Sequence, residues 1–546
     1  MMHLHSDWSY IEHQFGCSLP DRFLMALRAF DNIKSVTPFI LERGDRRFGL
    51  FLHVEHGNVE AARLPPDIEP VFYQPYFSFA QPRSTVHTSL EDAIGHVADG
   101  RTEIILDPRV PVGITKRLRN RLNVTFEALA NPGTVSVTTI ALGTALERLV
   151  RHRPRSNEIA RRLLDRSSLR DQIRPYLIDQ DDRRFDLLED LLGGADADAI
   201  IASSLINVQE LAGVPMRGKR RPLAAVYVKG GGLHLIESGR IDGAAIFDDI
   251  ADALNALVPS GNIALEEDDL ETWLVSSLGL SRRAMVPGDF LLRVWRDRLT
   301  LPDLGAYVVT TRASRHAMNQ ALDFARNAVL DEKLITELDA FDVYLSALRS
   351  FFQEFAPDFR VARTLTNFHS GARTMFPSNP AHYPVTKAAR TLKIDAGCLM
   401  MSPEGMMLGC SDIARTLCFE ESDQAILDTF QSAIRTRLVP ACAPGASGRD
   451  IHALATRIIS DAGPDLKSNP IYHDIGKTPD SYERDVGHLL GRNNLAHLKF
   501  TRTETNTLQE GMIACCEYQW PGEGYAIAYE DTCLVAGGSG LNLTED

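Results

Sequence analysis

The sequence predicts an α+β protein in which a larger C-terminal domain follows two smaller α/β modules. The chain has 546 residues, which corresponds to about three or four domains at roughly 100 to 200 residues each. The first half contains a weak internal duplication, and the second half interleaves helical stretches with hairpin-like pairs of strands rather than with regular βαβ units. We therefore expect domains over residues 1–170, 171–304 and 305–546.

The composition is that of an ordinary globular protein, with 44% hydrophobic and 24% charged residues. The net charge of -14 would repel phosphate backbones and anionic lipid, so we expect neither nucleic acid nor a membrane as a partner. No apolar run approaches the roughly 18 residues of a spanning helix, and the start of the chain lacks the basic and apolar regions of a signal peptide. These features favour a cytoplasmic protein.

The duplication consists of two strand-turn-strand segments, Phe48 to Leu64 and Ala225 to Ile241. Each is followed by a helical stretch and then by another apolar strand, at Thr102 to Pro108 and at Gly261 to Glu267. The segment from Arg151 to Arg184 is helical in pattern but rich in Arg and Asp, which favours a solvated connection between the modules.

The C-terminal domain begins with a long predicted helix that starts at Ser314 and stops at Pro357. Its apolar residues recur every three or four positions, so we expect them to form one core stripe, consisting of Leu334, Leu338, Phe341, Leu345, Leu348 and Phe352. Short apolar runs then predict strands near residues 393–401, 405–419, 511–520 and 525–537. Two helices are expected between them, over 426–438 and after residue 444.

The chain has eight cysteines, too few for a disulfide scaffold at this length. Seven of them lie between Cys398 and Cys533, and the adjacent pair Cys515 and Cys516 does not resemble a CxxC motif. We interpret them as reduced thiols packed in strands as small hydrophobic side chains. Zinc ligation or a redox role is the alternative.

Four carboxylates interrupt the apolar strand patterns: Asp395, Asp412, Glu517 and Glu530. A carboxylate on a half-buried strand is costly unless it is paired, hydrogen-bonded or bound to a cation. His488, between two glycines, adds an imidazole. Oxygen ligands with one imidazole suit Mn²⁺, Fe²⁺, Co²⁺ or Zn²⁺, and four carboxylates suffice for two ions about 3.5 to 4 Å apart. Separate salt-bridged or turn carboxylates are the alternative.

The order of these segments resembles the pita-bread metallopeptidase superfamily, the creatinase and methionine aminopeptidase-like group also called M24. The family pattern is matched in order by IDAG at 394–397, SDIART at 411–416, GHLLG at 487–491, LQEGMIACCE at 508–517 and YEDTCLV at 529–535. The resemblance covers roughly Leu301 to Thr544, and Ala197 to Pro215 is a weaker echo of the creatinase-type N-terminal domain. It implies two creatinase-N-like α/β domains before a pita-bread domain, as in three-domain Xaa-Pro aminopeptidase (aminopeptidase P), with prolidase also similar.

The resemblance implies a metal-binding role for each of the five matched residues. Asp395 would hold one ion, Asp412 and Glu530 would bridge two ions, and His488 with Glu517 would complete the second site. A metal-bridging hydroxide would be the nucleophile, and Glu517 the catalytic proton shuttle. Mn²⁺ is the ion expected first, with Zn²⁺, Fe²⁺ or Co²⁺ as alternatives, and relatives with such N-terminal modules imply a homodimer.

Two histidines are further candidates for catalysis. His382, in the run PAHYP, matches a family histidine that binds substrate and donates to it or to its oxyanion. The family's second histidine corresponds to Leu495 here, and His497 is the nearest replacement.

Other positions depart from the family pattern. Arg484 stands where many peptidase members have a histidine, and its bidentate fork suits a substrate carboxylate or another anion; a surface ion pair with Glu483 or Asp485 is the alternative. Ala528 replaces a common arginine. The two aspartates are farther apart than usual because of an even-numbered insertion around residues 402–405, a good turn sequence that can leave both side chains facing the same way.

Three functions remain open at this stage. The first is a dinuclear-metal hydrolase that cleaves a peptide-type C–N bond in a small peptide, as Xaa-Pro aminopeptidase or prolidase does. The second is a metal-dependent non-peptidase hydrolase or lyase of the same fold, acting on a small modified amino-acid-like substrate with Arg484 as the anion-binding residue. The third is a non-catalytic binding module, which five retained ligands disfavour.

Overall fold

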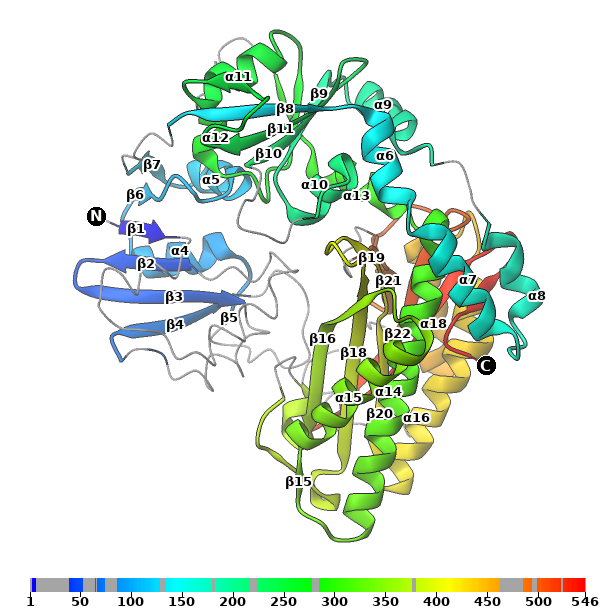
Figure 1. The fold of residues 1–546 in the computed structure, drawn as a ribbon. Coiled ribbons are helices and arrows are strands. Elements are labelled where there is room, and N and C mark those ends of the chain that lie inside the picture. Colours follow the sequence, from blue (N-terminus) through cyan, green and yellow to red (C-terminus); the bar gives the residue numbers. More distant parts are fainter. Residues whose placement is uncertain are drawn as a thin grey trace. The chain divides into compact units, whose positions relative to one another are not determined.

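The computed structural model describes residues 2–5, 39–52, 64, 66–73, 86–127, 133–178, 182–215, 223–276, 284–375, 380–461, 485–492, 498–521 and 524–545. The described chain forms two compact units (Figure 1). The first contains residues up to Arg151 and Asp182–Arg296, and the second contains His152–Asp181 and Asp297–Asp546. The expected three-domain division at residues 170 and 304 stays a prediction.

The first sheet of unit one has seven strands in the order β5-β4-β3-β2-β1-β6-β7. Its elements are β1 (Met2–His5), β2 (Phe39–Arg43), β3 (Arg46–Leu52), β4 (Ile68–Tyr73), β5 (Val86–His87), α4 (Leu90–Ala98), β6 (Glu103–Leu106), α5 (Val112–Arg119) and β7 (Asn123–Phe126). The observed hairpin pairs β2 with β3. Strand β3 is therefore the second strand of this hairpin and not the first strand of the segment expected over Phe48 to Leu64. Much of that segment, residues 53–63, lies outside the described residues.

The second sheet of unit one also has seven strands, in the order β12-β8-β11-β10-β9-β13-β14. The expected hairpin is β10 with β11, which pair antiparallel. The strands are β8 (Val135–Ile140), β9 (Ala199–Ala202), β10 (Ala224–Val228), β11 (Gly232–Ser238), β12 (Ala245–Phe247), β13 (Ile263–Leu265) and β14 (Met285–Pro287). The helices are α6 (Leu142–Val150), α9 (Arg184–Gly194), α10 (Leu205–Ala212), α11 (Ile250–Leu257), α12 (Thr272–Ser276) and α13 (Asp289–Asp297).

The charged segment after residue 151 forms α7 (Arg153–Leu164), α8 (Arg170–Ile173) and the short turn η3 (Arg174–Tyr176). It is helical as expected, but it is not a solvated connection. Helix α7 packs along α14 and buries Ile159, Ala160 and Leu164. Charged side chains dominate its sequence, yet its apolar residues repeat at helical spacing and cover a neighbour.

The second unit is built on the sheet β16-β18-β20-β23-β22-β21, with β19 paired to β18 and β24 paired to β23. Its strands are β15 (Ile335–Thr336), β16 (Arg360–Ser370), β17 (Pro384–Val385), β18 (Thr391–Met401), β19 (Met407–Cys410), β20 (Ile413–Cys418), β21 (Gly487–Leu489), β22 (Ile513–Pro521), β23 (Ala526–Val535) and β24 (Gly540–Asn542). The α-helices are α14 (Leu304–Leu330), α15 (Glu337–Phe355), α16 (Glu421–Ala433), α17 (Val439–Ala441) and α18 (Gly448–Asp461), with a π-helical turn η8 (Ile434–Leu438) after α16. Three short 3₁₀ turns complete it: η5 (Leu301–Asp303), η6 (Gly371–Met375) and η7 (Lys387–Ala389).

The single long helix expected from Ser314 is two helices, α14 and α15 (Figure 1). A capping box between Thr336 and Asp339 starts α15 anew, because the Thr hydroxyl and Asp carboxylate satisfy the free amides of a helix N-terminus. Leu334 therefore lies in the connection, 84% exposed, and the prediction that it belongs to the core is wrong. The buried face of α15 includes Tyr344 and Phe351 instead.

Candidate metal centre

The candidate site lies on one face of the second unit's sheet. Side chains alternate between the two faces along β22 and β23, and the strand register places Glu517 opposite Glu530. Tyr518, the next residue on β22, stacks on Phe430 of α16 with ring centroids 5.1 Å apart. The helices therefore cover the Tyr518 face of these two strands, and the two glutamates share the opposite face.

The side chain of Asp395, on β18, lies in the same cluster of carboxylates. Cys398, three residues later, donates from its Sγ to the Thr310 carbonyl oxygen of α14 at 3.5 Å, so Asp395 points away from that helix. Carboxylate oxygens of Asp395, Asp412 and Glu530 lie within 4.8 Å of one another. Asp412 and Glu530 are each only 2% exposed.

The extra residues between Asp395 and Asp412 form a hairpin extension. Strand β18 continues to Met401, turns at Ser402, where Gly405 donates its amide hydrogen to the Ser402 carbonyl at 3.0 Å, and returns as β19. The extension thus adds residues to both strands, as expected for an even-numbered insertion.

His488 is held next to these carboxylates by β21, where it pairs with Cys515 of β22. Its Nε2 lies 3.7 Å from Asp412 Oδ2 and 3.9 Å from Glu530 Oε1. Its Nδ1 lies 2.8 Å from the Leu489 carbonyl oxygen. Because a carbonyl oxygen only accepts, Nδ1 carries a hydrogen, and Nε2 is the ring nitrogen that faces the carboxylates.

Gly487 makes this placement of His488 possible. Its φ is +140°, and a Cβ added there would lie 2.0 Å from the Cys515 carbonyl oxygen. Only glycine lets the backbone of β21 approach β22 this closely.

The electrostatics of the group call for a cation. Burial raises the pKa of Glu530 well above its ordinary value, and the carboxylates of Asp412, Glu517 and Asp395 raise it further. The guanidinium of Arg415 opposes this rise, but it donates to the Glu530 carbonyl oxygen rather than to its carboxylate. Converging buried carboxylates with one imidazole nitrogen are the donor set that hard or borderline divalent ions prefer, so these residues fit such ions.

Three further residues belong to this group, and the sequence analysis did not find them. Asn367 Nδ2 donates to Asp395 Oδ2 at 3.3 Å, and Thr532 Oγ1 donates to the Asp412 carbonyl oxygen at 2.7 Å. The third is Cys515, whose Sγ lies within 4.8 Å of ligand atoms of His488 and Glu530. Strand alternation is the signal that places Cys515 on this face with Glu517, and Thr532 on it with Glu530; Asn367 carries no such signal.

His382 stands apart from the carboxylates. Its side chain is exposed, and in the described part of the chain no hydrogen bond or ion pair joins it to the five predicted metal ligands. Arg484 and His497 lie outside the described residues.

Glu337, at the start of α15, holds the segment that carries His382. Its carboxylate accepts from the amides of Ala381 at 3.0 Å and Ser370 at 2.8 Å, and from Arg373 Nε at 3.0 Å. Its own amide donates to the Tyr383 carbonyl at 3.0 Å. Burial raises the pKa of Glu337 to about 7, against the opposing effect of Arg373 and of the two amides. Glu337 therefore fixes the backbone on both sides of His382.

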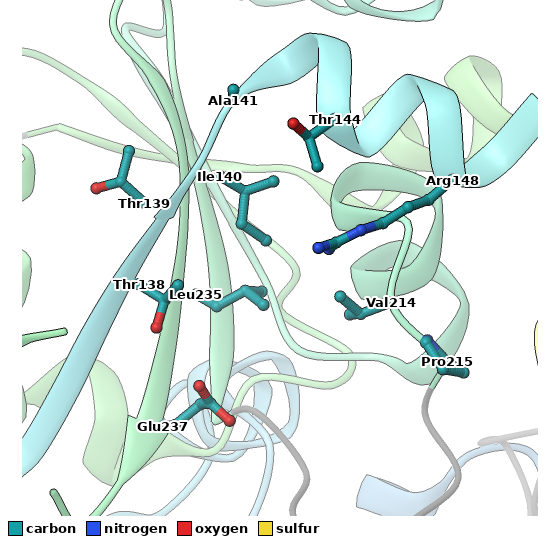
Figure 2. Close-up of a pocket in the computed structure, with 10 residues that line it drawn as sticks. All are labelled: Thr138, Thr139, Ile140, Ala141, Thr144, Arg148, Val214, Pro215, Leu235 and Glu237. Carbon is teal, nitrogen blue, oxygen red and sulfur yellow. The ribbon is translucent and has the colours of Figure 1, made fainter. Parts of the chain in front are cut away.

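A pocket of about 430 Å³ lies in the first unit, on the surface of β8 and β11 (Figure 2). Arg148 extends from α6 toward Ile140 and Val214, and Glu237 lies on β11 (Figure 2). None of the carboxylate group belongs to this pocket.

Comparison with known proteins identifies the domain that carries the carboxylates. Residues 310–536 match the model of metallopeptidase family M24. The fold is similar to that of X-prolyl aminopeptidase from Caenorhabditis elegans, described as a cytosolic enzyme with a di-nuclear active site: TM-score 0.57 and 10% identity, covering 93% of this chain and 81% of that one. It is also similar to dipeptidase PepE from Mycobacterium ulcerans: TM-score 0.51 and 17% identity, covering 67% and 95%. No curated protein sequence matches the chain.

These matches confirm the fold class expected from the sequence, with an M24 pita-bread domain in the C-terminal part of a mixed α and β protein. The match of residues 310–536 supports an enzyme of the M24 metallopeptidase type. No helix of the described residues combines the length and apolarity needed to cross a bilayer.

Proposed function

We propose that this chain, whose residues 310–536 form an M24 metallopeptidase domain, is a dinuclear-metal hydrolase that cleaves a peptide-type C–N bond, in the manner of Xaa-Pro aminopeptidase or prolidase. The observation that carries the proposal is the convergence of Asp395, Asp412 and Glu530 within 4.8 Å, with His488 Nε2 beside them. Glu517, opposite Glu530 on the same face, completes the set.

The proposed ligands are those five residues, and Asp412 and Glu530 would contribute to both ions. Two bound divalent ions, Mn²⁺ first among them, would lower the pKa of a water molecule and polarise the scissile carbonyl. Cys515 also brings a sulfur atom close to His488 and Glu530, but burial, together with the carboxylates of Glu530 and Asp412, raises the pKa of its thiol well above the ordinary value, so Cys515 is not among the proposed ligands.

Glu517 is the proposed proton carrier between the attacking water and the leaving nitrogen. It is 7% exposed, and Gln519 Nε2 donates to its Oε2 at 3.4 Å, which orients the carboxylate. His382, on the segment held by Glu337, is the proposed donor to the substrate carbonyl. His497 is a second proposed catalytic histidine, and Arg484 a proposed ligand of the substrate carboxylate.

The first test measures metal and activity together. Asp412→Ala and His488→Ala should lose both bound metal, measured by elemental analysis, and hydrolysis of Xaa-Pro peptides with added Mn²⁺. The wild-type chain should hold two equivalents of metal. A metal-free variant that keeps full activity would contradict the metal mechanism.

A second candidate function is a non-peptidase hydrolase or lyase of the same fold, favoured by Arg484 and by Ala528 in place of the family's arginine. Absence of Xaa-Pro cleavage under any divalent ion would favour it. Under either function, Arg484→Met should raise the Michaelis constant for an anionic substrate without a matching fall in kcat; an unchanged constant would remove Arg484 from the site. A homodimer and a cytoplasmic location are proposed with the function.

A further inference from the structure

A cluster of three thiols lies behind the sheet that carries the carboxylates. The Sγ atoms of Cys442, Cys516 and Cys533 lie within 4.8 Å of one another, and those of Cys442 and Cys516 are 3.4 Å apart. All three residues are 0% exposed. From the sequence, these residues are expected to be reduced thiols packed as small hydrophobic side chains, with zinc ligation or a redox role as the alternative.

The strand register explains why the thiols meet. Cys516 pairs with Asp531, and Cys533 lies two residues farther along β23, so the two cysteines are diagonal neighbours on one face. This is the helix-covered face, opposite the one that Glu517 and Glu530 share. Cys442 follows directly after α17 and reaches the same point from the helical layer.

The sulfur spacing fits one ion bound by all three atoms. Three sulfur atoms bound to one ion in a plane, each through a bond of about 2.3 Å, lie roughly 4 Å apart, which falls between the 3.4 Å measured for Cys442 and Cys516 and the 4.8 Å limit for the group. A disulfide would join only two of the three sulfurs, at about 2.05 Å.

The surroundings select the kind of ion. The cluster belongs to an apolar core that includes Phe430, Val439 and Tyr518, and no fourth His, Cys or carboxylate ligand joins the group among the described residues. Structural zinc sites need four ligands. Soft sulfur ligands without oxygen ligands favour Cu(I), and a monovalent ion adds the least charge to an apolar core.

We propose that Cys442, Cys516 and Cys533 form a second metal site, which takes one soft monovalent ion such as Cu(I). The ion binds as Cu⁺ with no change in oxidation state. Cys442 would bind as the thiolate after releasing one proton to solvent, and Cys516 and Cys533 would bind through the sulfur of the neutral thiol, so the site gains no net charge. The bound ion would tie the helical layer at α17 to β22 and β23.

The test titrates the folded full-length chain anaerobically with Cu(I), in competition with the chromophoric chelator bicinchoninate. We expect one equivalent to be withheld from the chelator, with only sulfur in its first coordination shell by X-ray absorption, and an increase in Tm. Cys442→Ser and Cys533→Ser should lose that equivalent. Cys418→Ser, on β20 outside the cluster, should keep it.

Two results would overturn the proposal: no retained copper in the wild-type chain, or copper bound through nitrogen or oxygen. The X-ray absorption spectrum of the wild-type protein shows which atoms bind the copper, so the proposal can be tested even if a cysteine variant does not fold. Asp412→Asn should lose the proposed hydrolase activity but keep the copper, so failure of one proposal is distinguishable from failure of the other.

Discussion

Glu337 illustrates how one side chain controls a segment distant from it in sequence. It is fully buried and contacts the backbone on both sides of His382. Nothing in the sequence around Glu337 separates it from the other acidic residues of a helix N-terminus, because its function depends on partners some 33 to 46 positions away.

The raised pKa of Glu337 predicts a pH-dependent stability. The ordinary value of 4.5 rises to about 7 in the folded protein, so between these values the folded state binds more protons than the unfolded chain. The contribution of Glu337 to stability is therefore complete below about pH 4.5 and is lost as the pH rises through about 7. Glu337→Gln lacks this titration. As the pH rises over that range, the free energy of unfolding of the wild-type chain should fall by about 3 kcal/mol relative to that of the variant. Urea unfolding at several pH values measures this difference.

The control for this experiment is Asp342→Asn, an exposed position on the same helix. It should leave the pH profile unchanged. A constant difference between wild type and Glu337→Gln at all pH values would contradict the expected titration. Faster hydrogen exchange at the Ala381 amide in the variant would show that the His382 segment has loosened.

Gly487 gives a second prediction at the scale of one residue. Gly487→Ala would place a methyl group 2.0 Å from the Cys515 carbonyl, so β21 would move away from β22 and carry His488 with it. We expect bound metal and peptide hydrolysis to fall together by at least 10-fold, as for loss of a metal-orienting contact. Gly143→Ala, on helix α6 with open space around it, should have no such effect. Full metal content in Gly487→Ala would refute the argument.

At the scale of elements, Asp531 joins parts of the second unit on the helix-covered face. Its buried carboxylate accepts from Arg415 of β20 at 2.5 Å, from Arg435 of η8 at 3.3 Å and from Asn542 of β24 at 2.8 Å. Burial opposes its ionisation, but these partners, Arg415 first, keep the pKa of Asp531 below its ordinary value. The residue next to a proposed metal ligand thus has a structural role.

Replacing Asp531 would leave two guanidinium groups without their shared carboxylate. Asp531→Asn should lower the free energy of unfolding by about 3 to 5 kcal/mol, measured by urea denaturation. Asp461→Asn, at the exposed end of α18, is the matched control and should stay within about 0.5 kcal/mol. A loss of activity with unchanged stability would assign Asp531 to catalysis instead.

The ligand motifs could be predicted from the sequence because each is a short local pattern: a carboxylate within an apolar strand, or a histidine between glycines. Strand alternation then assigns each residue to a face without any structure. It does not tell which strands are neighbours, so the approach of Cys442 to Cys516 and the contact of Asn367 with Asp395 remained out of reach. The break between α14 and α15 was missed because an apolar spacing of three and four continues through the connection at Leu334.

At the scale of the whole molecule, the second unit includes a segment that precedes much of the first unit in sequence. Arg153 of α7 donates to Asp303 Oδ1 at 2.7 Å, and Arg492 donates to the other carboxylate oxygen. All three side chains are buried. This network fastens α7 to the domain that carries the carboxylates.

The network predicts which unit a substitution will affect. Asp303→Asn should destabilise the second unit by about 3 to 5 kcal/mol and leave the unfolding transition of the first unit in place, as measured by differential scanning calorimetry. Asp323→Asn, which removes an exposed ion pair of α14, should change either transition by less than about 1 kcal/mol. Equal shifts of both transitions would contradict the assignment of α7 to the second unit.

The attachment of α7 also sets an order of events during synthesis. Arg153 leaves the ribosome 150 residues before Asp303, and translation at about 5 to 20 residues per second makes that interval roughly 8 to 30 seconds. Meanwhile α7 exposes the apolar side it will later bury on α14. Until α14 has been made, the new chain therefore carries a helix with an exposed apolar face. A chaperone that binds this face during the interval would protect the chain from aggregation.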